Sequence, residues 1–182
     1  MIIIGTNPAT PMRDQFDSFE QYWNGLTKTP ELFDSNYKKE HNGKTSKSTR
    51  NANQLLSQSE SLNVLVTNVV WYPVQKKKLI PKQEWAYGEH ALADLILHIK
   101  PKVIFCHGAD AESFIKKYYG FVDRYQSALE QNVVIDGILI LAYHHFSGQG
   151  LRKGSNFQPK SEFPIFSEKI YTHISGKNIN RS

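Results

Sequence analysis

Short apolar runs separated by longer mixed segments mark the strands of this chain. Residues 2–4 and 103–107 are compact runs of β-branched and other apolar side chains, and 62–71 is a longer one. Each has the length and composition of a buried strand rather than of a helix. Two more such runs, 133–135 and 138–141, flank an Asp-Gly pair. Because Asp-Gly favours a tight primed turn, they predict a hairpin whose second arm is the fourth strand of the core.

Apolar positions repeat with helical spacing in several segments between these runs. Residues 17–26 place aromatic and aliphatic side chains three and four apart, and 81–99 carries a longer apolar side that Pro101 ends. A further helix is predicted to begin at Ala109, in a first turn that is acidic. A last amphipathic helix is predicted over 163–174.

Strands that alternate with helices predict an α/β fold with three layers, α/β/α, around a central, mainly parallel four-stranded sheet. The chain has 182 residues, so we expect 1–182 to form a single domain. In such folds ligands bind beyond the carboxyl ends of the strands. The polar side chains expected at that edge are Asn7, Asn68, His107, His144 and His145.

The charge balance indicates a polyanionic partner. The formal net charge is +5 and the sequence pI is about 9.2. Lysine and arginine release counterions when they approach phosphates, so a basic surface suits nucleic acid. Part of this charge lies in residues 36–50, where basic side chains stand among Asn, Gly, Ser and Thr with little to bury. We therefore expect a mobile basic loop over 36–50.

The single cysteine is evidence against a protein held by internal disulfides, and the short apolar run at residues 1–4 is not the pattern of a signal peptide or a membrane span. Cys106 has no partner for an internal disulfide, and its apolar run is typical of a buried core. Residues 1–4 are too short for a signal peptide or a membrane span. We expect a cytoplasmic monomer, nucleoid-associated in a bacterium, with no membrane partner, no metal and no cofactor. A metal site of His107 with His144 or His145 is the alternative, but no third ligand is suitably spaced.

The polar residues at the predicted strand ends suit cleavage of an N-glycosidic bond. A side-chain amide both donates and accepts hydrogen bonds, so Asn7 and Asn68 could read the edge of a base or hold a water. A histidine at position 145 could donate to the negative charge on a departing base. Each residue also has a structural interpretation: Asn7-Pro8 is ordinary turn chemistry, and Asn68 within a strand needs only a hydrogen-bond partner.

Four short motifs, taken in order, resemble the uracil-DNA glycosylase superfamily. Each lies at or just beyond the end part of a predicted strand, and the similarity extends from Met1 to the region of Ile170. It is greatest to the mismatch-specific and single-strand-selective branches, which have Asn in the first motif. The motifs are Gly5-Thr6-Asn7-Pro8, Thr67-Asn68, Gly108-Ala109-Asp110 and His145-Phe146-Ser147-Gly148.

The resemblance implies a role for each matching residue. Asn7 would position the attacking water, and Asn68, with Thr6 nearby, would bind the polar edge of the base. His145 would stabilise the anion forming on the base, and Ser147 would hold a DNA phosphate. One aromatic side chain would stack on the flipped base, and the loop after the last strand would contact DNA and fill the gap. The aromatic candidates are Phe19, Trp23 and Phe33, and the DNA-contact candidates are Pro8, Ser147, Gly148, Gln149, Leu151, Arg152 and Lys153.

Several positions depart from the family pattern. Position 6 is Thr, and 9–11 lacks the Gly that is usual beyond the Asn-Pro pair. Phe146 stands where Pro is usual, and Gln149 stands where an intercalating Leu is common, so the wedge is Leu151 or Arg152 or is absent. No lysine occupies a motif position, so a Schiff-base step is not expected. The predicted function is that of a monofunctional DNA glycosylase acting on uracil, or a related damaged or mismatched base, in single- or double-stranded DNA. The alternatives are a non-catalytic nucleic-acid- or nucleotide-binding protein of the same fold, and a hydrolase of small nucleosides.

Overall fold

The computed structural model describes most of the chain. Its described residues are 1–6, 16–40, 42–59, 62–72, 74, 76–119, 133–148 and 158–176. Within helices, the side chains of Phe19, Trp23, Leu26, Thr27, Pro30 and Glu40 also lie outside the description.

A five-stranded sheet forms the centre of the described structure, in the order β2-β1-β3-β5-β4. The first four strands in this order run parallel to one another, and β4 pairs with β5 antiparallel. The parallel four-stranded core agrees with the sequence prediction, and the fifth strand is the first arm of the predicted hairpin. The strands are β1 (Ile2–Gly5), β2 (Leu65–Asn68), β3 (Val103–His107), β4 (Val133–Ile135) and β5 (Ile138–Tyr143).

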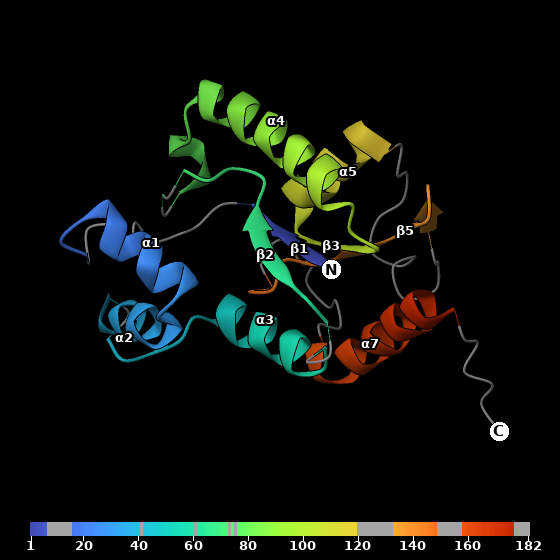
Figure 1. The fold of residues 1–182 in the computed structure, drawn as a ribbon, viewed down its shortest axis with the longest axis horizontal. Helices are drawn as coiled ribbons and strands as arrows, with labels where there is room; N and C mark the ends of the chain where they lie inside the picture. Colours follow the sequence, from blue (N-terminus) through green and yellow to red (C-terminus); the bar gives the residue numbers. More distant parts are fainter. Residues whose placement is uncertain are drawn as a thin grey trace.

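Helices cover both faces of the sheet, as Figure 1 shows with α4 and α5 on one side and α3 and α7 on the other. Ile2, Ile4 and Ile104 belong to one buried cluster, whereas Ile3 and Phe105 belong to the other. Alternate side chains of each strand therefore enter opposite layers of the core. The three-layer α/β/α prediction is confirmed. The helices are α1 (Phe19–Thr27), α2 (Pro30–Glu40), α3 (Lys47–Ser57), α4 (Lys82–Ile99), α5 (Ala109–Tyr119) and α7 (Pro159–Ser175), with a short 3₁₀ helix η2 (Lys77–Leu79).

The second strand is shorter than its apolar run predicts. Only residues Leu65–Asn68 pair in the sheet, at its edge, and Val66 is half exposed. Val69 and Val70 are fully buried, and they pack in the cluster beneath α4 and α5. Val69 and Val70 are thus used for packing against helices, which periodicity alone does not distinguish from strand pairing.

The loop predicted over 36–50 is largely helical, and this prediction is corrected. Helix α2 continues to Glu40, and α3 begins at Lys47. Ser46 caps α3, because its Oγ accepts a hydrogen bond from the backbone N–H of Thr49 at 3.1 Å. The polar composition of α3 hides a narrow apolar side, whose Leu55 is completely buried. Capping and burial of this side account for a helix where composition indicated none.

No helix in the described ranges is long and apolar enough to cross a bilayer.

Candidate functional site

The carboxyl ends of the parallel strands bring three predicted residues to one edge of the sheet. Asn68 ends β2 and is in register with Gly5 at the end of β1. His107 ends β3, next to the last residue of β5, and His145 follows β5 by two positions. We call Asn68, His107 and His145 the strand-end cluster: the first two lie against Gly5, and His145 lies against His107. The expectation that these side chains share one edge agrees with this geometry.

Gly5 holds two members of the cluster close together. A Cβ added at this position would lie 2.8 Å from Asn68 Oδ1 and 2.9 Å from His107 Nε2. Real Cβ atoms essentially never approach other heavy atoms below 3.0 Å. Only glycine therefore allows both polar side chains to approach the first strand, so the strand-end cluster depends on the absence of a side chain at position 5.

His107 is packed as a neutral aromatic ring. It stacks on Phe146 with ring centroids 4.0 Å apart and an interplanar angle of 10°. It also meets His145 edge to face at 5.3 Å. Burial, and secondarily the neighbouring His145, lowers the pKa of His107 to about 3. Its Nδ1 is buried and has no hydrogen-bond partner among the described residues.

His145 is held in one orientation by the residue two positions later. The backbone N–H of Ser147 donates to His145 Nδ1 at 3.2 Å, and the Ser147 hydroxyl lies 2.7 Å from the same nitrogen. Because Nδ1 accepts a hydrogen bond, the proton of the neutral ring resides on Nε2. Burial lowers the pKa of His145, and the Asp110 carboxylate partly opposes this. At neutral pH, His145 is therefore an uncharged donor through Nε2.

Gly108 makes room for the His145 ring. Its backbone has φ +88°, in the left-handed region, and an added Cβ would lie 3.2 Å from His145 Cδ2. Conformation and space both favour glycine at this position. The neighbouring His144 has different surroundings: its ring lies against Tyr143 at 5.6 Å. Burial lowers the pKa of His144, and Glu162 on α7 opposes that shift. The ring of His145 thus meets His107, whereas the ring of His144 lies against Tyr143, in agreement with the sequence argument that the two rings diverge.

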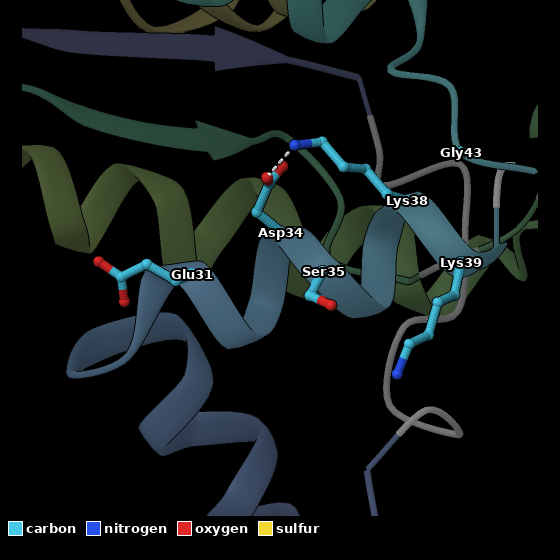
Figure 2. A pocket seen from close by; sticks show the side chains of 6 residues that line it. All are labelled: Glu31, Asp34, Ser35, Lys38, Lys39 and Gly43. Carbon is cyan, nitrogen blue, oxygen red and sulfur yellow. Dashed lines mark ion pairs between the residues drawn. The ribbon is translucent and has the colours of Figure 1, made fainter.

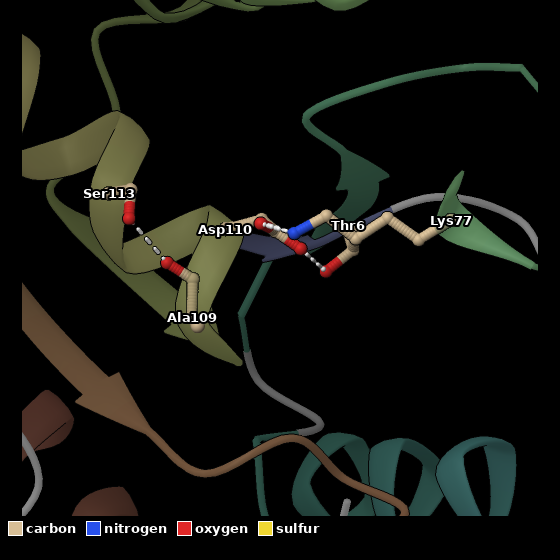
Figure 3. A network of polar contacts seen from close by, with 5 residues as sticks. All are labelled: Thr6, Lys77, Ala109, Asp110 and Ser113. Atoms are coloured by element: carbon tan, nitrogen blue, oxygen red, sulfur yellow. Dashed lines mark hydrogen bonds and ion pairs between the residues drawn. The ribbon is translucent and has the colours of Figure 1, made fainter. Parts of the chain in front are cut away.

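A second polar network joins the residue after β1 to the first turn of α5 and to η2, as Figure 3 shows. Thr6 Oγ1 donates to an Asp110 carboxylate oxygen at 3.0 Å, and Lys77 forms an ion pair with the other oxygen. Asp110 is in the first turn of α5, where a carboxylate is also favoured by the helix dipole. Sequence reasoning did not assign a role to Asp110 or Lys77. The Gly-x-Asp motif could have indicated a role for Asp110. No residue near Lys77 in the sequence indicates that Lys77 pairs with Asp110.

Several predicted site residues lie outside the described part of the chain. These are Asn7, Pro8, Gln149, Leu151, Arg152 and Lys153, together with the side chains of Phe19 and Trp23.

Phe33 and the glycine after Ser147 are described. The Phe33 ring stacks on Phe16 at 6.0 Å and meets Tyr22 at 6.1 Å, within the packing of α1 against α2. The described contacts thus place Phe33 in a helix–helix interface and do not join it to the strand-end cluster. Gly148 has φ +77°, and its backbone N–H donates to His145 O at 2.7 Å, closing a turn around Ser147.

Two surface hollows lie away from the strand-end cluster. One, of about 540 Å³, is on α2, where Lys38 is 2.5 Å from Asp34 and the Glu31 and Lys39 side chains diverge (Figure 2). Its lining residues are Glu31, Asp34, Ser35, Lys38, Lys39 and Gly43. The other, of about 450 Å³, lies between α3 and the start of α7 and is lined by Lys47, Asn51, Gln158, Pro159, Lys160 and Ser161.

The second hollow borders the His145 loop, because Asn51 Nδ2 donates to the Phe146 carbonyl at 2.6 Å. Neither hollow is lined by the strand-end cluster, and neither was predicted from the sequence. Within the described ranges, no three His, Cys, Asp or Glu residues gather as a metal ion would require.

Comparison with known families agrees with the fold and with the order of the motifs. The family model described as the uracil DNA glycosylase superfamily matches residues 1–164, which include each of the described strands and all three members of the strand-end cluster. This match supports a glycosylase type of function and DNA as the partner. No similar protein was found among the curated sequences compared with the chain. With its sheet order, its strand-end cluster and this match over most of its length, the chain belongs to the uracil-DNA glycosylase superfamily.

Proposed function

We propose that this protein is a monofunctional DNA glycosylase that hydrolyses the N-glycosidic bond of uracil, or of a related damaged or mismatched base. The observation that carries the proposal is the strand-end cluster. An amide at Asn68 and an oriented, neutral N–H at His145 lie at the edge where the first motif of the family begins. Membership of the superfamily supports the reaction type and DNA as substrate.

The reaction needs a donor for the base and a water for the sugar. As the bond between C1′ and the base nitrogen breaks, its electron pair stays on the base, which becomes an anion. Water adds its oxygen to C1′ and releases a proton to solvent, while the base anion takes up a proton. Asn68 would donate to and accept from the polar edge of the base, and Asn7 would hold the water. Both roles use side-chain amides that the chain has.

His145 suits the stabilisation of the base anion. Its Nδ1 is occupied by the Ser147 N–H, so Nε2–H is the atom available to a carbonyl oxygen of the base. A neutral donor strengthens its hydrogen bond as negative charge develops on that oxygen. The lowered pKa of His145 keeps the ring in this form at neutral pH. In this role His145 donates a hydrogen bond without giving up its proton.

A substrate panel tests the proposal. Single-stranded and duplex DNA with uracil, hypoxanthine, xanthine or a mismatched base is incubated with the protein, and abasic sites are detected by strand scission in alkali. We expect cleavage of at least one of these bases. His145→Ala should lower the rate by about a hundredfold or more, since one such donor contributes about 3 kcal/mol to the transition state. His144→Ala, the adjacent histidine with other neighbours, is the matched control and should retain the parent rate.

The panel also separates the alternatives. If no base is released but salt-sensitive DNA binding persists, the protein is a binding module of this fold, and the glycosylase proposal is wrong. If DNA is neither cleaved nor bound while free nucleosides are hydrolysed, it is a small-molecule hydrolase. If His145→Ala and His144→Ala reduce the rate equally with unchanged circular dichroism, the role given to His145 is incorrect.

A further inference from the structure

The loop from Trp71 to Leu79 joins β2 to α4 and exposes aromatic and basic side chains. Trp71 is 46% exposed and Tyr72 is 38% exposed, although both follow directly on a buried pair of valines. Lys76 and Lys78 are exposed in the same loop. Large exposed apolar side chains beside cations are the composition of surfaces that bind nucleic acid through base faces and phosphates.

The Trp71 ring is fixed beside the strand-end cluster. Its indole N–H donates to the backbone carbonyl of Asn68 at 2.9 Å and to Thr67 Oγ1 at 3.1 Å. Asn68 is the residue that would read the base, so the two side chains share one short segment of backbone. An exposed aromatic ring that is hydrogen-bonded at its edge keeps a constant orientation while its surface stays accessible.

The rest of the loop is also attached to the protein body. Val74 packs against the buried cluster beneath α4 and α5. Lys77 forms an ion pair with Asp110, and its Nζ lies 5.3 Å from the centre of the Trp85 ring. The described residues of this loop are thereby held at Trp71, Val74 and Lys77. A surface held in this manner loses little conformational entropy when a ligand binds.

We propose that Trp71 is a stacking platform for an unpaired nucleotide next to the target base, with Lys76 and Lys78 facing the phosphates of the same strand. In a duplex, both faces of every internal base are covered by neighbouring base pairs, so an aromatic ring can stack only on a base that has lost a neighbour. A single strand offers such base faces without the cost of opening a duplex, so the platform favours single-stranded DNA over an intact duplex. This inference rests on the proposed function, because the target base is the one bound by the strand-end cluster.

Binding to uracil-free DNA tests the platform without depending on cleavage. The affinities of the parent, Trp71→Ala and Trp71→Phe for a fluorescent single strand and for its duplex are measured by anisotropy. Stacking of one base predicts that Trp71→Ala weakens single-strand binding by about fivefold to a hundredfold. Duplex binding should change little. Trp71→Phe keeps an aromatic face and should retain most of the affinity.

A matched control uses another exposed aromatic residue. Tyr118 is 42% exposed near the end of α5, and its ring packs on Phe114 rather than on the strand ends. Tyr118→Ala should bind single strands as the parent does. The double variant Lys76→Gln/Lys78→Gln should reduce the dependence of log affinity on log salt by about 1.4, at about 0.7 per lost phosphate contact.

Three results overturn the inference. The first is equal single-strand affinity of Trp71→Ala and the parent. The second is an equal loss for single strands and duplex. The third is a Trp71→Phe variant as weak as Trp71→Ala, which would assign the effect to the indole hydrogen bonds instead of to stacking. If no base is released in the substrate panel but single-strand binding still depends on Trp71, the glycosylase proposal is wrong and the stacking role of Trp71 is retained.

Discussion

Replacing His107 with phenylalanine tests whether a buried neutral histidine makes this protein sensitive to acid. Phenylalanine keeps an aromatic ring against Phe146, with which His107 stacks at 4.0 Å, and removes the group that can be protonated. The pKa of His107 in the folded protein is about 3, against an ordinary value of 6.5. The unfolded chain therefore binds a proton between these two pH values and the folded protein does not.

The direction in which the free energy of unfolding changes with pH follows from this difference in proton binding. Stability rises with pH wherever the unfolded state binds more protons, so the free energy of unfolding is highest above pH 6.5 and falls as the pH drops toward 3. Integration over this range gives a loss of about 2 kcal/mol between pH 8 and pH 5 from His107 alone. The larger phenylalanine ring can lower the free energy of unfolding by an amount that does not depend on pH. That amount cancels, because only the change in the free energy of unfolding between the two pH values is compared.

The measurement is urea unfolding, followed by circular dichroism, of the parent and His107→Phe at both pH values. The free energy of unfolding of the parent should fall by about 2 kcal/mol more than that of the variant. His90→Phe, at a histidine whose side chain is 81% exposed, is the control for the loss of a histidine outside the core. The reasoning is refuted if the difference between parent and His107→Phe stays constant within about 0.5 kcal/mol from pH 8 to pH 5.

Three further variants test the geometry of the site. Gly5→Ala places a Cβ 2.8 Å from Asn68 Oδ1, so base release should fall by at least about tenfold and stability by about 1–3 kcal/mol, measured by the abasic-site assay and urea unfolding. A fully active Gly5→Ala protein would contradict the proposed crowding. Asp110→Asn removes a carboxylate that raises the pKa of His145, so the acid limb of the pH–rate profile should move to lower pH. A move to higher pH would contradict this effect of Asp110 on His145. Ser147→Ala keeps the backbone N–H that orients His145, so the rate should fall by no more than about tenfold, which is the effect of one hydrogen bond. A loss as large as that of His145→Ala would show that the Ser147 hydroxyl, and not the backbone N–H, orients the ring.

Much of the sheet could be predicted because burial acts on each apolar run separately. The strand at 103–107 was predicted with the bounds that the structure has, and the hairpin around Asp136-Gly137 forms where its turn residues indicate. Both central turn residues have positive φ, 51° and 77°. The four parallel strands follow from the alternation of these runs with helices.

Helix α3 shows where the local pattern is insufficient. Its composition is polar, and few apolar positions mark its buried side. The helix is stabilised by contacts with distant segments: Leu55 is buried in the second core cluster, and Asn51 bonds to the Phe146 carbonyl, 95 positions away. Local propensity is a weak indicator when tertiary packing supplies most of a helix's stability.

For the site, the sequence by itself placed His107 and His145 at one edge, because each ends or follows a run of apolar side chains. The apolar run that contains Asn68 continues to Trp71, so only pairing with β1 shows that the second strand ends at Asn68. Only the tertiary structure decided how they are connected: His107 stacks on Phe146 and is kept neutral by burial, and Thr6 is bonded to Asp110, which is 104 positions away. These contacts depend on strand order and register, which are set by the packing of all the layers together and are absent from any single stretch of sequence.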